Sequence, residues 1–385
     1  MKKYGILTLF HRNYNYGGFL QAYALHKFLL NHDKNVQLIK YEYMTEKKSV
    51  HKSKFSALRQ YSLCEIIKKL KGIANNKLNY NKIADFQKNK GIVFEKFVKD
   101  YMVTSKENVS YNDILNNKLW VNGYIVGSDQ VWNPNVLTDG FLLKNIPENI
   151  EKISYAASIA RNSLSDLEKK SYLPINDFDY ISVREKQAKD ILKDVVEKQV
   201  NVVMDPVFLL TKEQWLDLAG ERIINEEYVL FYLFNNSQKY IETVKKYCNE
   251  RGLKLILIPY TDGKYNKAEY KNREYHYQGL LGPKEFVNLI ANAKLVFTDS
   301  FHGVSLSSIL NTNFVLLKRD KESSKTSKNS RLTNILNILE LEDRTVTIDK
   351  FANKELIDFE KVNHIIDEKR KGSIEFLLEA LKEEK

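Results

Sequence analysis

Short apolar runs rich in β-branched and aromatic residues alternate with amphipathic stretches along most of the chain. This alternation predicts parallel strands that are connected and covered by helices. The fold class expected is therefore α/β. The runs fall into two sets, at residues 4–10, 36–41, 124–127, 153–157, 180–183 and 200–204, and then at 228–234, 253–258, 294–298 and 314–318.

The length of the chain favours two domains. Its 385 residues exceed what one hydrophobic core usually organises, and a hydrophobic content of 43% is enough to fill two cores. We place the boundary at Asp205, because Pro206 disfavours a helix for the residue before it. The expected domains are residues 1–205 and 206–350. Apolar residues at helical spacing predict a final helical segment at 351–385.

Residues 44–110 form a basic insertion in the first domain. They carry 15 basic side chains against six acidic ones, which accounts for most of the formal net charge of +11. Two helices are predicted there, one with an apolar face and one anchored by aromatic residues: Leu63, Ile66, Ile67, Leu70 and Ile73, then Phe86, Phe94 and Phe97. The insertion is either a solvated helical elaboration or a surface that meets an anionic membrane or a phosphorylated acceptor. Nucleic acid is not expected, since no recognised module accompanies the charge.

The cysteine content and the hydropathy pattern favour the cytoplasm. Cys64 and Cys248 are the only cysteines and lie far apart, so neither a disulfide framework nor a zinc site is expected. The N-terminal apolar run is too short for a signal peptide, and no stretch approaches the roughly 18 apolar residues that a membrane span needs.

The first apolar run leads into a turn rich in glycine and asparagine, followed by a helical pattern. Gly17 lets the backbone approach a ligand, and the start of the helix favours an anion. The neighbouring polar and aromatic candidates are Asn15, Tyr16 and Gln21. Neither GxGxxG nor GxxxxGK[ST] occurs, which gives no support for a dinucleotide site or a P-loop. The alternative is a turn that needs glycine only for its conformation.

Polar residues also follow the run at 124–127, where open α/β sheets place their ligands. Asp129 is interpreted either as the cap of the next turn or as a site carboxylate. It has three candidate neighbours, Ser128, Gln130 and Trp132.

Arg184 ends the run at 180–183. At a strand end it can clamp a phosphate or carboxylate with two N–H groups, whereas on a solvated helix it would be ordinary.

The most informative segment spans residues 294–305. An apolar run stops at Ser300 and is followed by His302 and Gly303 at the start of a helix rich in small residues. A single histidine is usually structural, but this one lies at a predicted strand end. Basic residues follow downstream, among them Lys318, Arg319 and Arg331. This combination favours a base or an anion-binding donor at His302.

Taken together, these segments resemble the polysaccharide pyruvyl transferase family. The resemblance covers almost the whole chain through NYGGFLQAYAL, VGSDQVWNP, SYAAS, ISVREKQ, VVMDPVFLL, GPKEFVNLI, TDSFHG and NSRLTNIL. It implies a glycosyltransferase-B-like fold, in which two Rossmann-type domains with parallel sheets face a cleft and the final helix returns to the N-terminal domain. It also implies phosphoenolpyruvate as donor and a hexose as acceptor, with no catalytic metal and no cofactor besides this co-substrate.

The resemblance also assigns expected roles. His302 matches the family's catalytic histidine, and Arg184 matches the arginine of its VRE motif. Many members have Arg-Leu-His-Gly where this chain has Ser300-Phe301-His302-Gly303, so Arg331 or Lys318 is expected to replace one arginine. Asp129 is the second catalytic candidate, as the group that orients the acceptor. The remaining predicted contacts are Ser300, Gly303 and Arg319 with the donor, and Asn15, Tyr16, Gly17, Gln21, Ser128, Gln130 and Trp132 with the acceptor.

The residue types fit this chemistry by themselves, because forming a pyruvate ketal needs cationic partners for the donor, an acid and a base. The expected acceptor is a lipid-linked saccharide precursor of a cell-surface polysaccharide, met at the inner face of the membrane. Two other functions remain open. One is a glycosyltransferase of the same fold that uses a nucleotide sugar, and the other is a non-catalytic module that binds a glycan or an anion.

Overall fold

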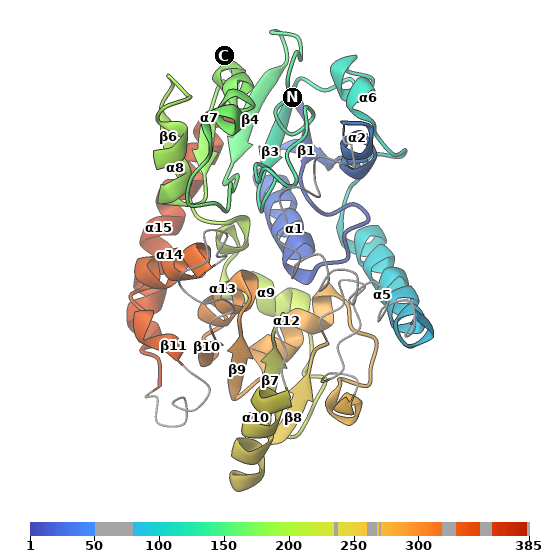
Figure 1. Cartoon of the computed structure of the whole chain (residues 1–385), viewed down its shortest axis with the longest axis vertical. Helices are drawn as coiled ribbons and strands as arrows, with labels where there is room; N and C mark the ends of the chain where they lie inside the picture. The colour runs from blue at the N-terminus through green and yellow to red at the C-terminus, as the bar shows by residue number, and fades with distance from the viewer. Residues whose placement is uncertain are drawn as a thin grey trace, which may run out of the picture.

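The computed structural model describes residues 1–50, 80–234, 238–259, 268, 271–317, 329–346 and 356–382. All ten predicted strands are present, which confirms the α/β class (Figure 1). Six precede residue 205: β1 (Lys3–Leu7), β2 (Asn35–Leu38), β3 (Gly123–Gly127), β4 (Glu151–Tyr155), β5 (Ile181–Val183) and β6 (Val200–Val202). Four follow it: β7 (Tyr228–Tyr232), β8 (Lys254–Leu257), β9 (Leu295–Thr298) and β10 (Phe314–Leu317).

The N-terminal half contains a parallel sheet in the order β2-β1-β3-β4. In β1, Ile6 pairs with Leu38 of β2 on one side and with Ile125 of β3 on the other. Strands β5 and β6 form a separate parallel pair that continues the layer, since isolated parallel bridges join Ile153 to Tyr180 and Ala157 to Val183.

Two serine side chains strengthen the junction between β4 and β5. Ser154 Oγ donates to Ser182 O (3.1 Å) and accepts from Ser182 N (2.9 Å). Ser182 Oγ donates to Ser154 O (2.8 Å) and accepts from Ala156 N (3.1 Å). Both serines are fully buried. Their hydroxyls thus satisfy backbone groups that a regular ladder would have paired directly.

The C-terminal half contains a second parallel sheet in the order β11-β10-β9-β7-β8. Its edge strand β11 (Thr345–Val346) was not predicted, because two residues are too short for a recognisable apolar run. The last strand of the N-terminal half ends at Val202, and the first strand of the second sheet begins at Tyr228. The chain therefore passes from one half to the other in the stretch that contains the predicted boundary at residue 205.

Helices connect the strands and cover both sheets. Capping boxes begin three of the short helices, through Ser110 with Asp113, Ser165 with Glu168 and Thr211 with Gln214. Those of the N-terminal half are α1 (Tyr16–Asn31), α2 (Tyr43–Val50), α5 (Tyr80–Tyr101), α6 (Tyr111–Leu115), α7 (Asp166–Lys170) and α8 (Lys186–Leu192). Those that follow are α9 (Lys212–Ala219), α10 (Gln238–Glu250), α12 (Pro283–Ala291), α13 (Phe301–Ile309), α14 (Asn329–Leu339) and α15 (Phe359–Ala380).

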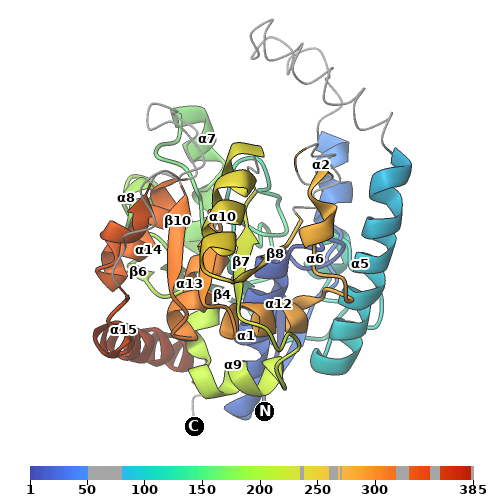
Figure 2. The ribbon, with the colours of Figure 1, turned by 90° about the horizontal axis from the view of Figure 1, so that it is seen from below.

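The two halves meet through a packed layer of helices. Helices α1, α9, α12 and α13 lie between the two sheets (Figures 1 and 2), and one hydrophobic cluster includes buried residues from both halves. Tyr16 at the start of α1 stacks on Phe286 of α12, with ring centroids 4.7 Å apart and nearly parallel planes. Phe94 and Tyr232 pack against the same tyrosine. The seam between the halves is therefore apolar and closely packed here.

Part of the basic insertion is described. The second predicted helix is α5, and two of its predicted anchors, Phe94 and Phe97, are buried as expected. The first predicted helix, with its apolar face at residues 63–73, lies outside the described residues, as does the side chain of Phe86.

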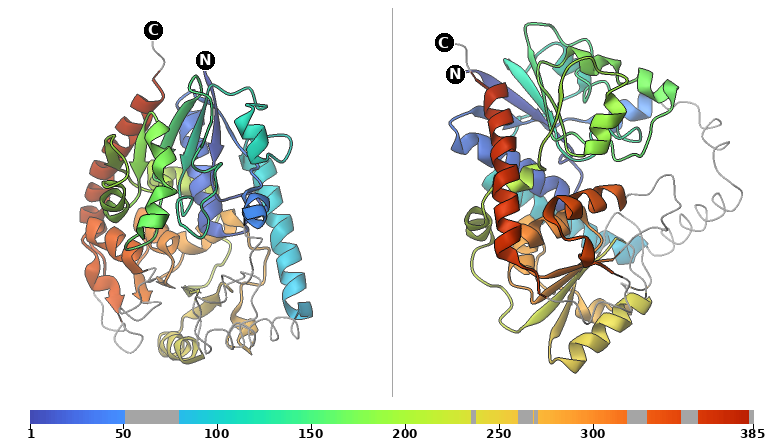
Figure 3. Two further views of the ribbon diagram at one scale, coloured as in Figure 1. Left: turned by 45° about the horizontal axis from the view of Figure 1, so that its top comes forward. Right: turned by 90° about the vertical axis from the view of Figure 1, so that its left-hand side faces the viewer.

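The C-terminal helix α15 runs along both halves (Figure 3). Ser373 Oγ accepts from Met204 N at 2.9 Å, and Phe376 packs edge-on against Tyr180. Arg370 donates through Nε to Phe208 O at 2.6 Å. Lys34 Nζ reaches the helix end at Leu381 O (3.0 Å).

The bond from Met204 N to Ser373 allows a test of the packing of α15. Both residues are buried, so replacing Ser373 by alanine leaves a buried N–H without its acceptor. We expect Ser373→Ala to lower the free energy of unfolding by about 1–3 kcal/mol. Urea denaturation monitored by circular dichroism measures this change.

Glu375→Ala is the matched control, because Glu375 is exposed on the same helix. It should change stability by less than about 0.5 kcal/mol. Equal effects of the two substitutions would show that α15 does not depend on the buried bond.

Candidate functional site

Each parallel sheet has a position where the chain changes direction across the sheet. In the N-terminal half β1 lies between β2 and β3, and in the C-terminal half β7 lies between β8 and β9. Open α/β sheets bind ligands outside the carboxyl ends of the strands at such switch points. Thr8, Ser128 and Asp129 follow the strands of the first switch point, and Asp299 and Ser300 follow β9 at the second.

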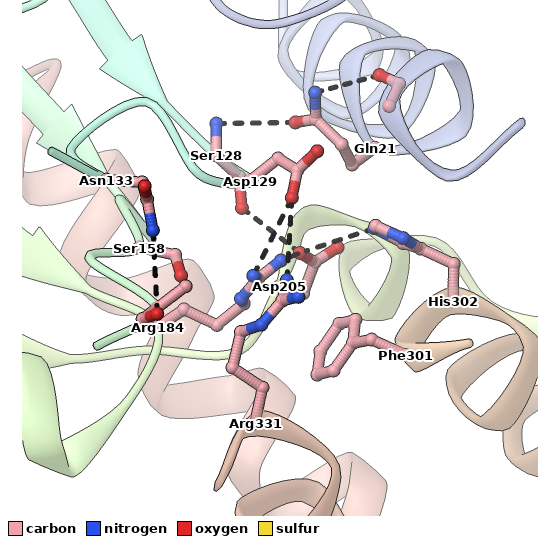
Figure 4. Close-up of polar contacts among 12 residues, drawn as sticks. Gln21, Ser128, Asp129, Asn133, Ser158, Arg184, Asp205, Phe301, His302 and Arg331 are labelled. Carbon is pink, nitrogen blue, oxygen red and sulfur yellow. Dashed lines mark hydrogen bonds and ion pairs between the residues drawn. The ribbon is translucent and has the colours of Figure 1, made fainter. Parts of the chain in front are cut away.

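Polar residues from both switch points meet around one buried carboxylate, that of Asp205 (Figure 4). Its Oδ2 accepts from Arg184 Nη1 at 2.7 Å and from Ser128 Oγ at 3.1 Å. Oδ1 accepts from Val207 N at 3.1 Å, which caps the 3-10 helix Pro206–Leu209. From the C-terminal half, His302 Nε2 approaches Oδ2 to 3.7 Å. Asp205 therefore links the two halves at their switch points.

The groups around Asp205 determine its ionisation. Burial alone would raise the pKa of this carboxyl group, since it disfavours the charged form. Attraction from His302 and Arg184 outweighs burial and holds the pKa well below its ordinary value. The site thus contains a buried carboxylate anion at neutral pH.

Arg184 is surrounded by carboxylates. Besides Asp205, its Nε lies 3.5 Å from Glu185 Oε1 and its Nη2 lies 3.8 Å from Asp129 Oδ1. The guanidinium also lies 4.4 Å from the ring centroid of Phe301, a cation–π contact across the halves. Burial opposes the charge of Arg184, but these carboxylates raise its pKa. Its Nη2 is buried and makes no hydrogen bond to a described residue.

Arg331 brings a second guanidinium to the cluster from α14. Its Nη1 lies 3.8 Å from Asp129 Oδ1, and its side chain is 9% exposed. Asp129 is therefore shared between two arginines, one from each half (Figure 4). Arg331 thus lies on the same carboxylate as Arg184, and its predicted role in replacing an arginine of the donor site stays a prediction.

His302 is held by the start of α13. Ser300 is the N-cap, and its hydroxyl accepts from Gly303 N at 3.3 Å. The imidazole packs against the first turn of α1, where a Cβ on Gly17 would overlap the ring. His302 is 7% exposed, and its Nε2 makes no hydrogen bond to a described residue. Gly17 is thus required for the approach of His302.

A network of buried hydrogen bonds positions the loop after β3. Gln21 Nε2 donates to Thr8 Oγ1 (2.8 Å) and to Gly18 O (2.9 Å), while its Oε1 accepts from Ser128 N (3.3 Å). Ser128 Oγ also donates to Ala156 O at 3.0 Å. Gln21 and Ser128 are fully buried, so the structure gives them a positioning role in place of the predicted contact with an acceptor.

Two predicted acceptor contacts need correction. Trp132 is completely buried, and its Nε1 donates to Phe141 O at 3.1 Å in the core of the N-terminal half. Tyr16 is buried in the seam between the halves, stacked on Phe286. Buried side chains surround both rings, so neither ring has a face open to a sugar.

The other predicted contacts are differently placed. Asn15 caps α1 by accepting from Gly18 N at 3.2 Å, and both Asn15 and Gln130 remain partly exposed near the cluster. Gly303 lies against Thr298, where a Cβ would overlap the hydroxyl. Lys318 and Arg319 lie outside the described residues.

Sequence analysis missed the roles of Asp205 and Glu185. Asp205 was used only to place a domain boundary, although it stands in the VVMDPVFLL segment, three residues after the end of β6. Glu185 follows Arg184 and accepts a hydrogen bond from Ser158 Oγ. A carboxylate after each of two neighbouring strands was the available signal, since parallel strands end at the same edge of a sheet.

Comparison with known proteins agrees with the motifs found in the sequence. The family described as polysaccharide pyruvyl transferase matches residues 15–321, which is well over half of the chain. The chain belongs to the polysaccharide pyruvyl transferase family. A comparison with curated protein sequences finds no match.

Several solved structures resemble the fold of this family member. The UDP-GlcNAc 2-epimerase of Neisseria meningitidis bound to UDP-GlcNAc has 11% identity and a TM-score of 0.48, covering 98% of this chain and 100% of that one. A putative UDP-N-acetylglucosamine 2-epimerase of Listeria monocytogenes has 12% identity and a TM-score of 0.49, with 95% of each chain covered. At such identities and TM-scores the likeness says nothing about ligand or reaction.

In the described ranges no three His, Cys, Asp or Glu side chains gather as ligands of a metal ion. Among the helices described, none is long and apolar enough to span a bilayer.

The buried pair of Asp205 and Arg184 generates a stability prediction. Asp205→Asn removes the negative charge and leaves Arg184 less compensated, so we expect a loss of about 3–5 kcal/mol in the free energy of unfolding. The lowered pKa of Asp205 also stabilises the fold above the unfolded-state pKa of about 3.9, and this contribution is lost as the pH falls. Wild-type stability should therefore decrease more steeply than that of the variant from about pH 5 to pH 3.

Urea denaturation at several pH values measures both effects. Asp33→Asn is the control, because Asp33 is exposed and asparagine tolerates its positive φ of 55°. If Asp205→Asn were no more destabilising than Asp33→Asn, the buried ion pair would have no stabilising role.

Proposed function

We propose that this protein transfers a pyruvyl group from phosphoenolpyruvate to a hexose, forming a pyruvate ketal and releasing phosphate. One observation supports the proposal above the others. His302, Arg184 and Arg331 come from both halves and converge on Asp205 and Asp129 where the two switch points meet. Two guanidinium groups suit a small donor that has both a phosphate and a carboxylate.

The reaction balances without an oxidant or a reductant. A proton adds to the methylene carbon of phosphoenolpyruvate, and two hydroxyls of one hexose each form a C–O bond to the neighbouring carbon. The bond between that carbon and the phosphate oxygen breaks. Of the two protons lost by the hydroxyls, one accounts for the new methyl group and the other leaves with phosphate.

Each cluster residue has a proposed role in these steps. His302 moves the proton, since its Nε2 has no hydrogen-bond partner among the described residues. Arg331 binds the donor, and the Nη2 of Arg184 adds a second donor contact. Asp205 acts through His302 and Arg184 and is a positioning residue. Asp129 holds both arginines and orients the acceptor.

The acceptor side is proposed near the loop after β3, where Asn15 and Gln130 remain partly exposed. The proposed acceptor is a lipid-linked precursor of a cell-surface polysaccharide, modified on the cytoplasmic side of the membrane. No cofactor besides phosphoenolpyruvate takes part in the proposed reaction. The basic insertion is proposed to contact anionic lipid; six of its 14 lysines, between residues 52 and 77, lie outside the described residues.

Donor binding gives the first test. Phosphoenolpyruvate should raise the melting temperature without added metal, whereas nucleotide sugars should have little effect. Arg331→Gln should weaken phosphoenolpyruvate binding by about 1.5–3 kcal/mol, because a charge-assisted hydrogen bond is lost. Thermal shift and isothermal titration calorimetry measure these changes. Stabilisation by nucleotide sugars alone would favour the glycosyltransferase alternative.

Substitution of Arg184 is not a clean test of donor affinity. Its charge compensates three carboxylates, so Arg184→Ala should destabilise the fold before any change in donor affinity can be measured.

Proton transfer gives the second test. His302→Gln should keep the fold, because glutamine is polar and of similar reach, but turnover should fall by about 10²–10⁴. Phosphate release in the presence of a hexose-containing acceptor measures turnover, and thermal melting measures the fold. His364→Gln is the matched control, since His364 is exposed on α15. Near-normal turnover of His302→Gln would leave His302 with a structural role only.

A further inference from the structure

A large cavity lies between the two halves and shares no lining residue with the cluster around Asp205. Its volume is about 970 Å³. One wall is formed by α5 of the N-terminal half, including Lys90, and the other by residues 271–281 of the C-terminal half. The two walls are in contact, because a Cβ on Gly282 would meet Val93 Cγ1 at 2.5 Å. Helix α5 lies beside this C-terminal segment in Figure 1.

The cavity is basic. Lys90, Lys271 and Arg273 line it, and Glu274 is the only acid among the described lining residues. A second cavity of about 780 Å³ in the N-terminal half provides a comparison. Its lining is balanced, with Lys144, Arg161 and Lys170 against Glu46, Asp139 and Glu168. Of these two cavities, only the one between the halves has an excess of positive charge among its described lining residues, and this excess favours an anionic ligand.

Lys90 is a buried component of this wall. Its side chain is 8% exposed, and its Nζ lies 4.5 Å from the ring centroid of Tyr16 and 5.3 Å from that of Phe94. These cation–π contacts hold the ammonium group in place at the wall. A fixed cation loses less conformational entropy when it binds an anion than a mobile surface lysine does.

The same chain segment borders both the cavity and the catalytic candidate. Tyr16 lies under Lys90, and its hydroxyl donates to Leu281 O at 3.4 Å, on the opposite wall of the cavity. The next residue, Gly17, packs against the imidazole of His302. The start of α1 therefore contacts both the cavity wall and the cluster.

The size of the cavity argues against the donor as its occupant. Ligand cavities commonly measure about 300–1,000 Å³, so this one suits a ligand much larger than a three-carbon phosphate. We propose that the cavity binds the diphosphate end of a carrier-linked saccharide acceptor. This inference rests on the proposed function and adds to it a separate binding site. The carrier is either a lipid or a nucleoside, since both present the same diphosphate chemistry.

The test removes the two exposed cations. Farnesyl diphosphate, UDP and inorganic pyrophosphate are titrated into the full-length protein by calorimetry, with and without saturating phosphoenolpyruvate. In the double variant Lys271→Gln with Arg273→Gln, binding of the diphosphate probes should weaken by about tenfold or more. The affinity for phosphoenolpyruvate should stay within about twofold, because the cavity shares no residue with the cluster. Lys90 is left unchanged because it packs on core rings.

Lys170→Gln is the control, since Lys170 is an exposed lysine of the balanced cavity. It should leave all affinities unchanged. Tighter binding of farnesyl diphosphate than of UDP would identify a lipid carrier, and the reverse a nucleotide carrier; both support the site. Diphosphate binding that is absent, that phosphoenolpyruvate abolishes by competition, or that ignores the double variant overturns it. If phosphoenolpyruvate fails to bind while the double variant still loses farnesyl diphosphate, the proposed function fails and the diphosphate site stands.

Discussion

The buried guanidinium of Arg184 determines how the strand ends of the N-terminal half are arranged. A charge with a side chain only 2% exposed is tolerated when carboxylates and hydrogen bonds compensate for its lost hydration. Its carboxylates come from three places along the chain, Asp129 after β3, Glu185 after β5 and Asp205 after β6. Three strand ends must therefore converge on one cation, and this convergence forms the floor of the candidate site.

The C-terminal half completes the charge balance of this site. His302 approaches Asp205, Arg331 approaches Asp129, and the ring of Phe301 covers the guanidinium of Arg184. The carboxylates of Asp129 and Asp205 in one half thus face the guanidinium of Arg331 and the imidazole of His302 in the other. Any change in the relative position of the halves alters these distances together, so ligand binding and domain packing are expected to be energetically coupled.

The sequence predicted the parts of this structure that depend on local patterns. Apolar runs located ten strands, and the polar end of the run at 294–298 located His302 at the start of α13. The role of Asp205 was not predicted, because it depends on contacts with residues that are distant in the sequence. Locally, Asp205 is only the cap of the 3-10 helix that begins at Pro206. The predicted acceptor contact of Trp132 was wrong for a related reason. A residue near a strand end can point to the ligand edge or into the core, and residue type alone does not distinguish these directions.

The position of α15 also has a consequence for the order in which the chain is made. This helix supplies the acceptor for Met204 N and reaches Lys34, so the N-terminal half uses partners from the last residues of the sequence. During synthesis those partners have not yet been translated when β1–β6 emerge from the ribosome. The surface that α15 covers therefore stays exposed on the nascent N-terminal half. We expect a chaperone that binds the nascent chain to act on this surface.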